Sequence, residues 1–113
     1  MKLVEEPIGL TELKEMTARG FGTLVKGVVD VEAGIMALDA ELHADEEALL
    51  LEHGSNQRDL WGINLYPEID GDEWIEFDSV INLRPASGNR TRGVDDPAVR
   101  DRIRRIVTRL VRR

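Results

Sequence analysis

The sequence predicts an α+β fold, a two-layer sandwich in which a mostly antiparallel sheet of about five strands carries three helices on one face. Alternating apolar and polar residues mark two β-hairpins, over residues 24–43 and 60–84. Apolar residues at helical spacing mark helices over residues 9–19, 44–53 and 97–110. The two patterns alternate along the chain, which is typical of strands and helices that share one core.

The predicted order of elements is β-α-β-β-α-β-β-α. Its first six elements match the ferredoxin-like order β-α-β-β-α-β, with one strand and one helix added. A twofold α-β-β repeat is the alternative, because each hairpin follows a helix, although no residue-level repeat accompanies it. At 113 residues the chain is long enough to bury a core as a single domain, residues 1–113, and it has no cysteine.

The first two elements are a short edge strand and a helix. Residues 1–5 form the strand, and Pro7 ends it because proline has no backbone N–H to donate. The helix over residues 9–19 carries its leucines and its methionine on one face, and Gly20 ends it.

The first hairpin is predicted to turn at Ala33-Gly34. A two-residue loop there places apolar or small residues opposite each other on one face, for example Val29 opposite Leu38. The type of turn stays open, because Ala33 resists the positive φ of a type I′ turn. The helix that follows begins with acidic residues, which favour a helix N-terminus.

The second hairpin turns around Gly71. A three-residue loop sets Leu65 opposite Phe77, so that apolar side chains share one face. A two-residue loop would instead set Leu65 opposite Glu76. The second strand of this hairpin is predicted to run over residues 74–84.

The last helix has the clearest pattern in the chain. Asp96 is predicted as its N-cap and Pro97 as its first helical residue. The apolar residues then recur at i, i+4, i+7, i+8 and i+11, at Val99, Ile103, Ile106, Val107 and Leu110.

Charge is divided unevenly along the chain. The formal net charge of −7 combines −14 over residues 1–83 with +7 over residues 84–113. Such a chain either neutralises itself across its own surface or presents its basic part to an acidic partner. It carries neither a secretory signal nor an apolar run of membrane-spanning length, so a cytoplasmic protein without a membrane partner is expected.

The sheet face away from the helices is predicted to carry polar side chains. Glu76 and Asp78 project together from one strand and could hold a divalent cation or share a proton, with His43 as a third catalytic candidate. The aromatic and amide groups on this face suit a bound ligand. These are Asn64, Tyr66, Trp74 and Asn82. A plain solvated face is the other interpretation, since alternation produces one whenever the opposite face is buried.

The loop over residues 84–93 is a candidate anion site, because arginine side chains, hydroxyls and exposed backbone N–H groups can cradle a phosphate or carboxylate. Its candidate residues are Arg84, Ser87, Asn89, Arg90 and Arg92. Alternatively, these arginines pair with the acidic part of the chain. No nucleotide-binding motif and no metal-ligand spacing is present, so neither a metal nor a cofactor is predicted. Nucleic acid is a disfavoured partner of so acidic a protein.

Three segments carry a family resemblance: ELHADEEALLLE (41–52), LWGINLYP (60–67) and WIEFDSVINLRPASGNRTRGVDDP (74–97). They resemble a family of small bacterial proteins known only as a domain of unknown function. The resemblance spans nearly the whole chain. It implies a single bacterial cytoplasmic domain and assigns no catalytic residue.

Three hypotheses for function follow. The favoured one is a binding or regulatory module that recognises an anionic ligand through the Arg84–Arg92 loop. The second is a small metal-dependent hydrolase that uses Glu76 and Asp78, so whether the protein is an enzyme stays open. The third is a protein-interaction or homodimerisation module. The possible partners are an anionic small molecule for the binding module, and an acidic protein or a second copy of the chain for the interaction module.

Overall fold

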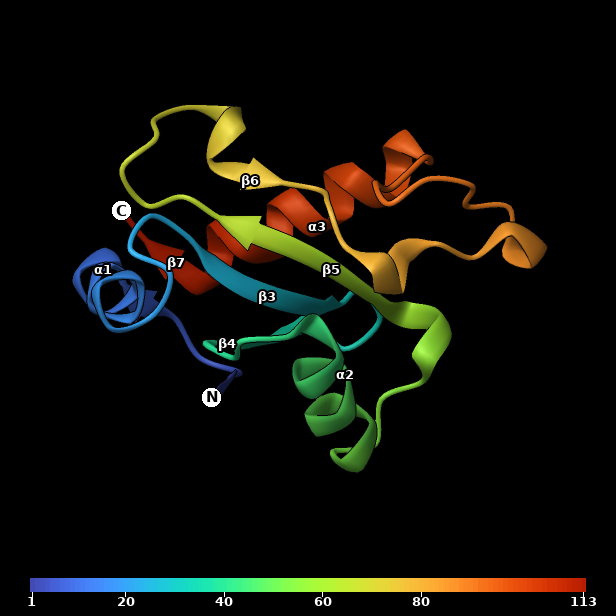
Figure 1. Cartoon of the computed structure of the whole chain (residues 1–113), viewed down its shortest axis with the longest axis horizontal. Coiled ribbons are helices and arrows are strands. Elements are labelled where there is room, and N and C mark those ends of the chain that lie inside the picture. The colour runs from blue at the N-terminus through green and yellow to red at the C-terminus, as the bar shows by residue number, and fades with distance from the viewer.

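Five strands form one antiparallel sheet in the computed structural model, which describes residues 1–113. Their order across the sheet is β1 (Lys2–Val4), β4 (Ile35–Leu38), β3 (Val25–Asp30), β5 (Leu60–Leu65) and β6 (Ile75–Glu76). A separate parallel pair joins β2 (Ile8–Gly9) to β7 (Val111–Arg112). The helices are α1 (Leu10–Arg19), α2 (His43–Glu52) and α3 (Pro97–Leu110). The predicted α+β class, the five-stranded antiparallel sheet and the three helices are confirmed (Figure 1).

Two crossovers order the sheet. β1 and β3 run in the same direction with β4 between them, and α1 lies in their connection. β4 and β5 also run in the same direction with β3 between them, and α2 lies in theirs. Both are split β-α-β units. Both crossovers move from the β1 edge toward the β6 edge of the sheet, but they start from β1 and β4, which run in opposite directions. Two right-handed crossovers of this kind must pass over opposite faces of the sheet.

The helices therefore occupy both faces, whereas the sequence prediction placed all three on one. α1 and α3 join the main core of 18 buried residues, which includes Val29 and Ile63. α2 packs through Leu50 against Val28 and Ala37, the neighbours that point to the other face. Figure 1 shows α2 and α3 on either side of β3 and β5. In a ferredoxin-like fold the second crossover would return along the sheet, so this structure departs from that order in its second half.

The register of the first hairpin differs from the prediction by two residues. Val29 lies opposite Met36, not Leu38, and four residues form the connection. The cause is Asp30, whose buried carboxylate accepts hydrogen bonds from the backbone N–H groups of Glu32 and Ala33, both at 2.9 Å, and so shapes a longer turn. A shift of two residues leaves every side chain on its predicted face.

The predicted strand over residues 74–84 is mostly absent. Only Ile75 and Glu76 pair with β5, with Leu65 opposite Ile75, and a 3-10 turn follows at Val80–Asn82. The buried Asn82 side chain takes the place of a strand there. Its Oδ1 accepts from the N–H of Gly62 at 2.8 Å, and its Nδ2 donates to the carbonyl oxygen of Gly62 at 2.9 Å. One amide thus satisfies the backbone edge of β5 that a strand would otherwise cover.

This arrangement requires glycine at position 62, because Ser79 lies directly over it. A Cβ atom at Gly62 would approach the Cβ of Ser79 to 2.5 Å, closer than any real contact of this kind. Residues 78–82 therefore cross the sheet face at a position where only glycine fits.

The last helix begins as predicted. The Asp96 carboxylate accepts from the N–H of Ala98 at 2.9 Å, and Pro97 is the first helical residue. Two of its arginines bind the connection between β3 and β4: Arg102 pairs with Glu32 at 3.7 Å, and Arg109 donates to the carbonyl oxygen of Gly34 at 2.5 Å. None of the helices combines the length and apolar character needed to cross a bilayer.

Candidate functional site

One corner of the α2 side of the sheet stays uncovered. Lys26, Asn64 and Glu76 lie directly opposite one another on β3, β5 and β6. Their side chains therefore form a row across that face. α2 covers the neighbouring half of the face through Leu50, and Ser79 crosses above Gly62. The row is bounded by these two segments.

A cleft of about 590 Å³ contains this row. Its polar and charged lining residues are Lys26, His43, Asn64, Tyr66, Glu76, Asp78, Ser79 and Arg92. Five of them were predicted as site residues, namely His43, Asn64, Tyr66, Glu76 and Asp78 from the sheet face. Arg92 was predicted from the loop. The structure brings these six side chains to one place.

Hydrogen bonds hold the floor of the cleft. Asn64 Nδ2 donates to Glu76 Oε1 at 2.8 Å and to the carbonyl oxygen of Asp78 at 3.3 Å. The Tyr66 hydroxyl donates to the same Glu76 oxygen at 3.1 Å. Asn64 is only 7% exposed, yet its Oδ1 has no hydrogen-bond partner. Partial burial, together with the bond to Glu76, raises the pKa of Tyr66, so the phenol stays a donor at neutral pH.

His43 lies at the edge of the cleft as a neutral imidazole. Burial, the largest cause, and the charge of Lys26 lower its pKa, and this is opposed by hydrogen bonding to the backbone of Ile63 and to the side chain of Asn64. Its Nε2 lies 2.8 Å from the carbonyl oxygen of Ile63, an acceptor, so Nε2 carries the proton and Nδ1 is left as an acceptor. No group of three His, Asp or Glu side chains in the chain is placed to hold a metal ion.

Two cations line the cleft, and they differ in their partners. Arg92 Nε donates to Asp78 Oδ1 at 2.8 Å, so these two charges form an exposed ion pair. Lys26 has no carboxylate partner, and its Nζ lies 5.1 Å from the centroid of the Phe21 ring. Lys26 is thus the cation of the cleft that no acidic side chain neutralises.

The first turn of α2 also borders the cleft. Leu42 occupies the N-cap position, where its side chain cannot accept a hydrogen bond, and no side chain caps this helix. His43 and Ala44 line the cleft beside it. The first backbone N–H groups of a helix lack partners within it, so an uncapped start favours a nearby anion.

Asn89, another predicted residue of the Arg84–Arg92 loop, stabilises the loop and does not face a ligand. Asn89 Nδ2 donates to the carbonyl oxygens of Asn82, Thr91 and Gly93 at 2.7, 3.1 and 2.8 Å, and its Oδ1 accepts from the N–H of Asp95 at 2.8 Å. Asn89 is buried, and its hydrogen bonds fix the conformation of the loop around it.

Arg84 points toward the protein and away from a ligand. Its guanidinium donates to the carbonyl oxygens of Arg58 and Ile81, both at 3.2 Å, and to that of Leu60. The guanidinium carbon also lies 4.4 Å from the centroid of the Trp61 ring. Arg84 therefore fastens the loop to β5.

The other predicted residues do not reach the cleft. Ser87 and Arg90 are exposed on the loop. Trp74 is buried in the main core, with the guanidinium of Arg113 4.4 Å from its ring centroid. Of the predicted anion loop, Arg92 alone joins the cleft. Sequence reasoning missed Lys26 as a site residue, although strand alternation places it on the face opposite Val29.

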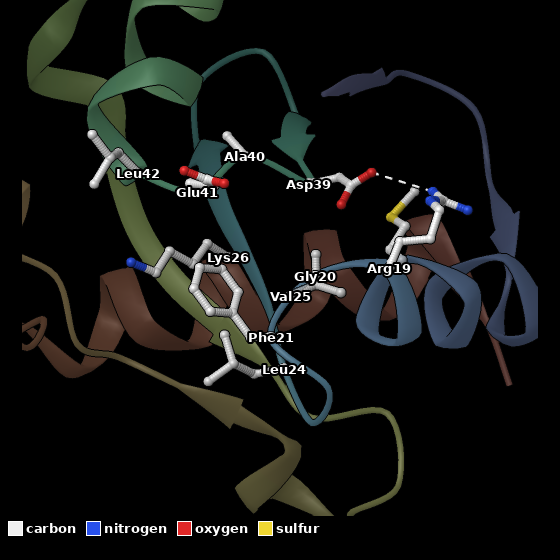
Figure 2. A pocket seen from close by; sticks show the side chains of 11 residues that line it. Arg19, Gly20, Phe21, Leu24, Val25, Lys26, Asp39, Ala40, Glu41 and Leu42 are labelled. Atoms are coloured by element: carbon white, nitrogen blue, oxygen red, sulfur yellow. Dashed lines mark hydrogen bonds and ion pairs between the residues drawn. The ribbon is translucent and has the colours of Figure 1, made fainter.

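A second hollow of about 480 Å³ adjoins the cleft. Figure 2 shows it: Lys26 lies between Leu42 on one side and Phe21 and Leu24 on the other, and Arg19 pairs with Asp39 at its far end. Leu24, Lys26 and Leu42 line both hollows. The lining of the second hollow combines apolar side chains with the charged residues Arg19, Lys26, Asp39 and Glu41.

Comparisons with known proteins bear on the family alone. Residues 2–110 match the family described as protein of unknown function (DUF5674). This confirms the family resemblance over nearly the whole chain, while its bacterial origin stays an expectation. Comparisons with curated proteins and with solved structures gave no match.

Proposed function

Since the chain belongs to the DUF5674 family, whose function is unknown, we propose from its geometry that it is a binding module for a small molecule with an anionic group. The binding site is the cleft around Lys26, not the outer part of the Arg84–Arg92 loop. The observation that carries this proposal is the position of Lys26, a cation without a carboxylate partner inside a cleft of about 590 Å³.

Two neighbours support an anion at this position. The N-terminus of α2 borders the cleft, so the positive end of its helix dipole lies beside the anion. Arg92 retains donors beyond the Nε that binds Asp78. Within the loop itself, by contrast, Arg84 is engaged by carbonyl oxygens and Arg90 stands exposed.

The test is a thermal-shift panel of small carboxylates and inorganic phosphate on the wild-type protein and two variants. At least one anion is expected to raise Tm, because a ligand that binds only the folded state stabilises it. Lys26→Met should abolish the shift. Lys14→Met is the matched control, since Lys14 has the same charge and pairs with Glu68 at 3.4 Å on the surface. It should leave the shift unchanged. A panel without any shift, or an equal shift in Lys26→Met, would refute the proposal.

A further inference from the structure

We propose that the ligand of this cleft is a zwitterion, an amino acid with an apolar side chain, whose carboxylate lies at Lys26 and whose ammonium group lies at Glu76. This inference rests on the proposed function, because it takes the anionic group at Lys26 as given. It adds the second charge of the ligand and its apolar part.

The first support is a carboxylate oxygen that no group of the chain engages. Glu76 Oε1 accepts hydrogen bonds from Asn64 Nδ2 at 2.8 Å and from the Tyr66 hydroxyl at 3.1 Å, which hold the carboxylate in place. Its Oε2 accepts no hydrogen bond, and Glu76 is an exposed residue that lines the cleft. An ammonium group on a ligand can donate to this oxygen. A simple anion has no such donor.

The second support is the charge of the row. Asp78 is paired with Arg92, which leaves Glu76 as the carboxylate in the cleft without a cation. Lys26 is the cation without a carboxylate, and Asn64 stands between the two. Neighbouring strands lie about 4.8 Å apart, so β3 and β6 are separated by roughly 10 Å, which a small molecule spans. A plain anion would face Glu76, and a plain amine would face Lys26. A zwitterion satisfies both.

The third support is the apolar surface beside Lys26. Phe21 and Leu42 are 48% and 57% exposed, and with Leu24 they flank the Lys26 side chain at the junction of the two hollows (Figure 2). A ligand whose carboxylate reaches Lys26 therefore has apolar surface within reach, which favours an aliphatic or aromatic substituent.

The experiment compares three probes of the same shape by isothermal titration calorimetry: leucine, 4-methylpentanoate, which lacks the ammonium group, and 3-methylbutylamine, which lacks the carboxylate. Leucine is expected to bind most tightly, with each of the others at least tenfold weaker. Glycine, which has no side chain, should also bind at least tenfold more weakly than leucine. Equal binding of leucine and 4-methylpentanoate would overturn the zwitterion and leave the proposed function standing. Failure of both leucine and 4-methylpentanoate to bind would overturn the amino-acid ligand, and the proposed function would fall with it only if the thermal-shift panel also shows no anion that raises Tm.

Variants assign the two charges to their residues. Glu76→Gln should reduce leucine affinity at least tenfold and leave 4-methylpentanoate affinity unchanged or higher, because a like charge is removed. Lys26→Met should weaken both. Glu73→Gln, at an exposed position outside the cleft, is the charge-matched control and should alter neither. Urea unfolding of each variant checks that it is folded. Unchanged leucine affinity in folded Glu76→Gln would overturn the assignment of the ammonium group.

Discussion

The two faces of the sheet differ in what they bury. The α1 and α3 face carries the main core of 18 buried apolar residues. The α2 face has a buried apolar cluster of four, and beside it lie polar groups without partners, including Asn64 Oδ1 and Glu46 Oε1. One face therefore provides most of the apolar burial that stabilises the fold. The other is free to keep unsatisfied polar groups, which are costly for stability and useful for binding.

β5 shows this difference within one strand. Ile63 and Asn64 are adjacent, so their side chains point to opposite faces. Ile63 is fully buried in the main core, and Asn64 lies in the floor of the cleft. Variants at these neighbouring positions measure the two faces separately.

The largest expected effect comes from Ile63→Ala. It should lower the free energy of unfolding by about 3 kcal/mol, because it leaves a cavity in a packed core. Asn64→Ala should lower it by only about 1 kcal/mol, because the lost hydrogen bonds lie at the border of the cleft. Urea unfolding followed by circular dichroism measures both. Equal losses would mean that the two faces contribute alike.

The next effect concerns Glu46, which is fully buried in α2. Burial raises its pKa from 4.5 to about 9, and the hydrogen bond that it accepts from the N–H of Ala40 at 3.0 Å opposes this only in part. The folded protein thus holds this proton more tightly than the unfolded chain. The contribution of Glu46 to stability is full below pH 4.5 and declines as the pH rises through about 9.

Glu46→Gln should remove this decline, because glutamine keeps the shape and cannot ionise. The variant is expected to exceed the wild type in free energy of unfolding by on the order of 2 kcal/mol at pH 8. Urea titrations at pH 5, 7 and 8 test the slope. Glu52→Gln, at the exposed end of the same helix, should retain the wild-type pH dependence. An unchanged slope in Glu46→Gln would show that Glu46 is ionised in the folded protein.

The smallest effect is expected in the loop beyond the polar face. Arg90→Ala should change the free energy of unfolding by less than about 0.5 kcal/mol, because its side chain is exposed. It should also leave anion binding intact. Arg84→Ala should cost about 1.5 kcal/mol, since it removes bonds to three carbonyl oxygens and the contact with Trp61. Loss of anion binding in Arg90→Ala would show that the anion binds the Arg84–Arg92 loop and not the cleft around Lys26.

Sequence patterns located the faces of the strands better than their pairing. Both hairpin registers differ from the predicted ones by two residues, at Val29 opposite Met36 and Leu65 opposite Ile75. Because side chains alternate with a period of two, such an error moves no residue to the wrong face. This is why Asn64, Tyr66 and Glu76 were assigned to one polar face although the predicted register of the hairpin was wrong.

Two polar residues explain the first register error and the missing strand. Asp30 lengthens the first connection by accepting hydrogen bonds from backbone N–H groups, and the pattern of apolar residues does not predict this longer turn. Asn82 replaces a predicted strand by binding Gly62 with its side chain. Both are single polar residues whose partners are chosen by the folded chain.

The amino-acid sequence alone determined the α+β class, the start of α3 at Pro97 with Asp96 as its N-cap, and the polar face of the second hairpin. Each rests on local physics, namely side-chain periodicity and helix capping. The face covered by α2 and the meeting of Lys26 with Asn64 and Glu76 were decided by the tertiary structure. They depend on the handedness of crossovers and on which strands become neighbours, and these are relations between segments distant in the chain.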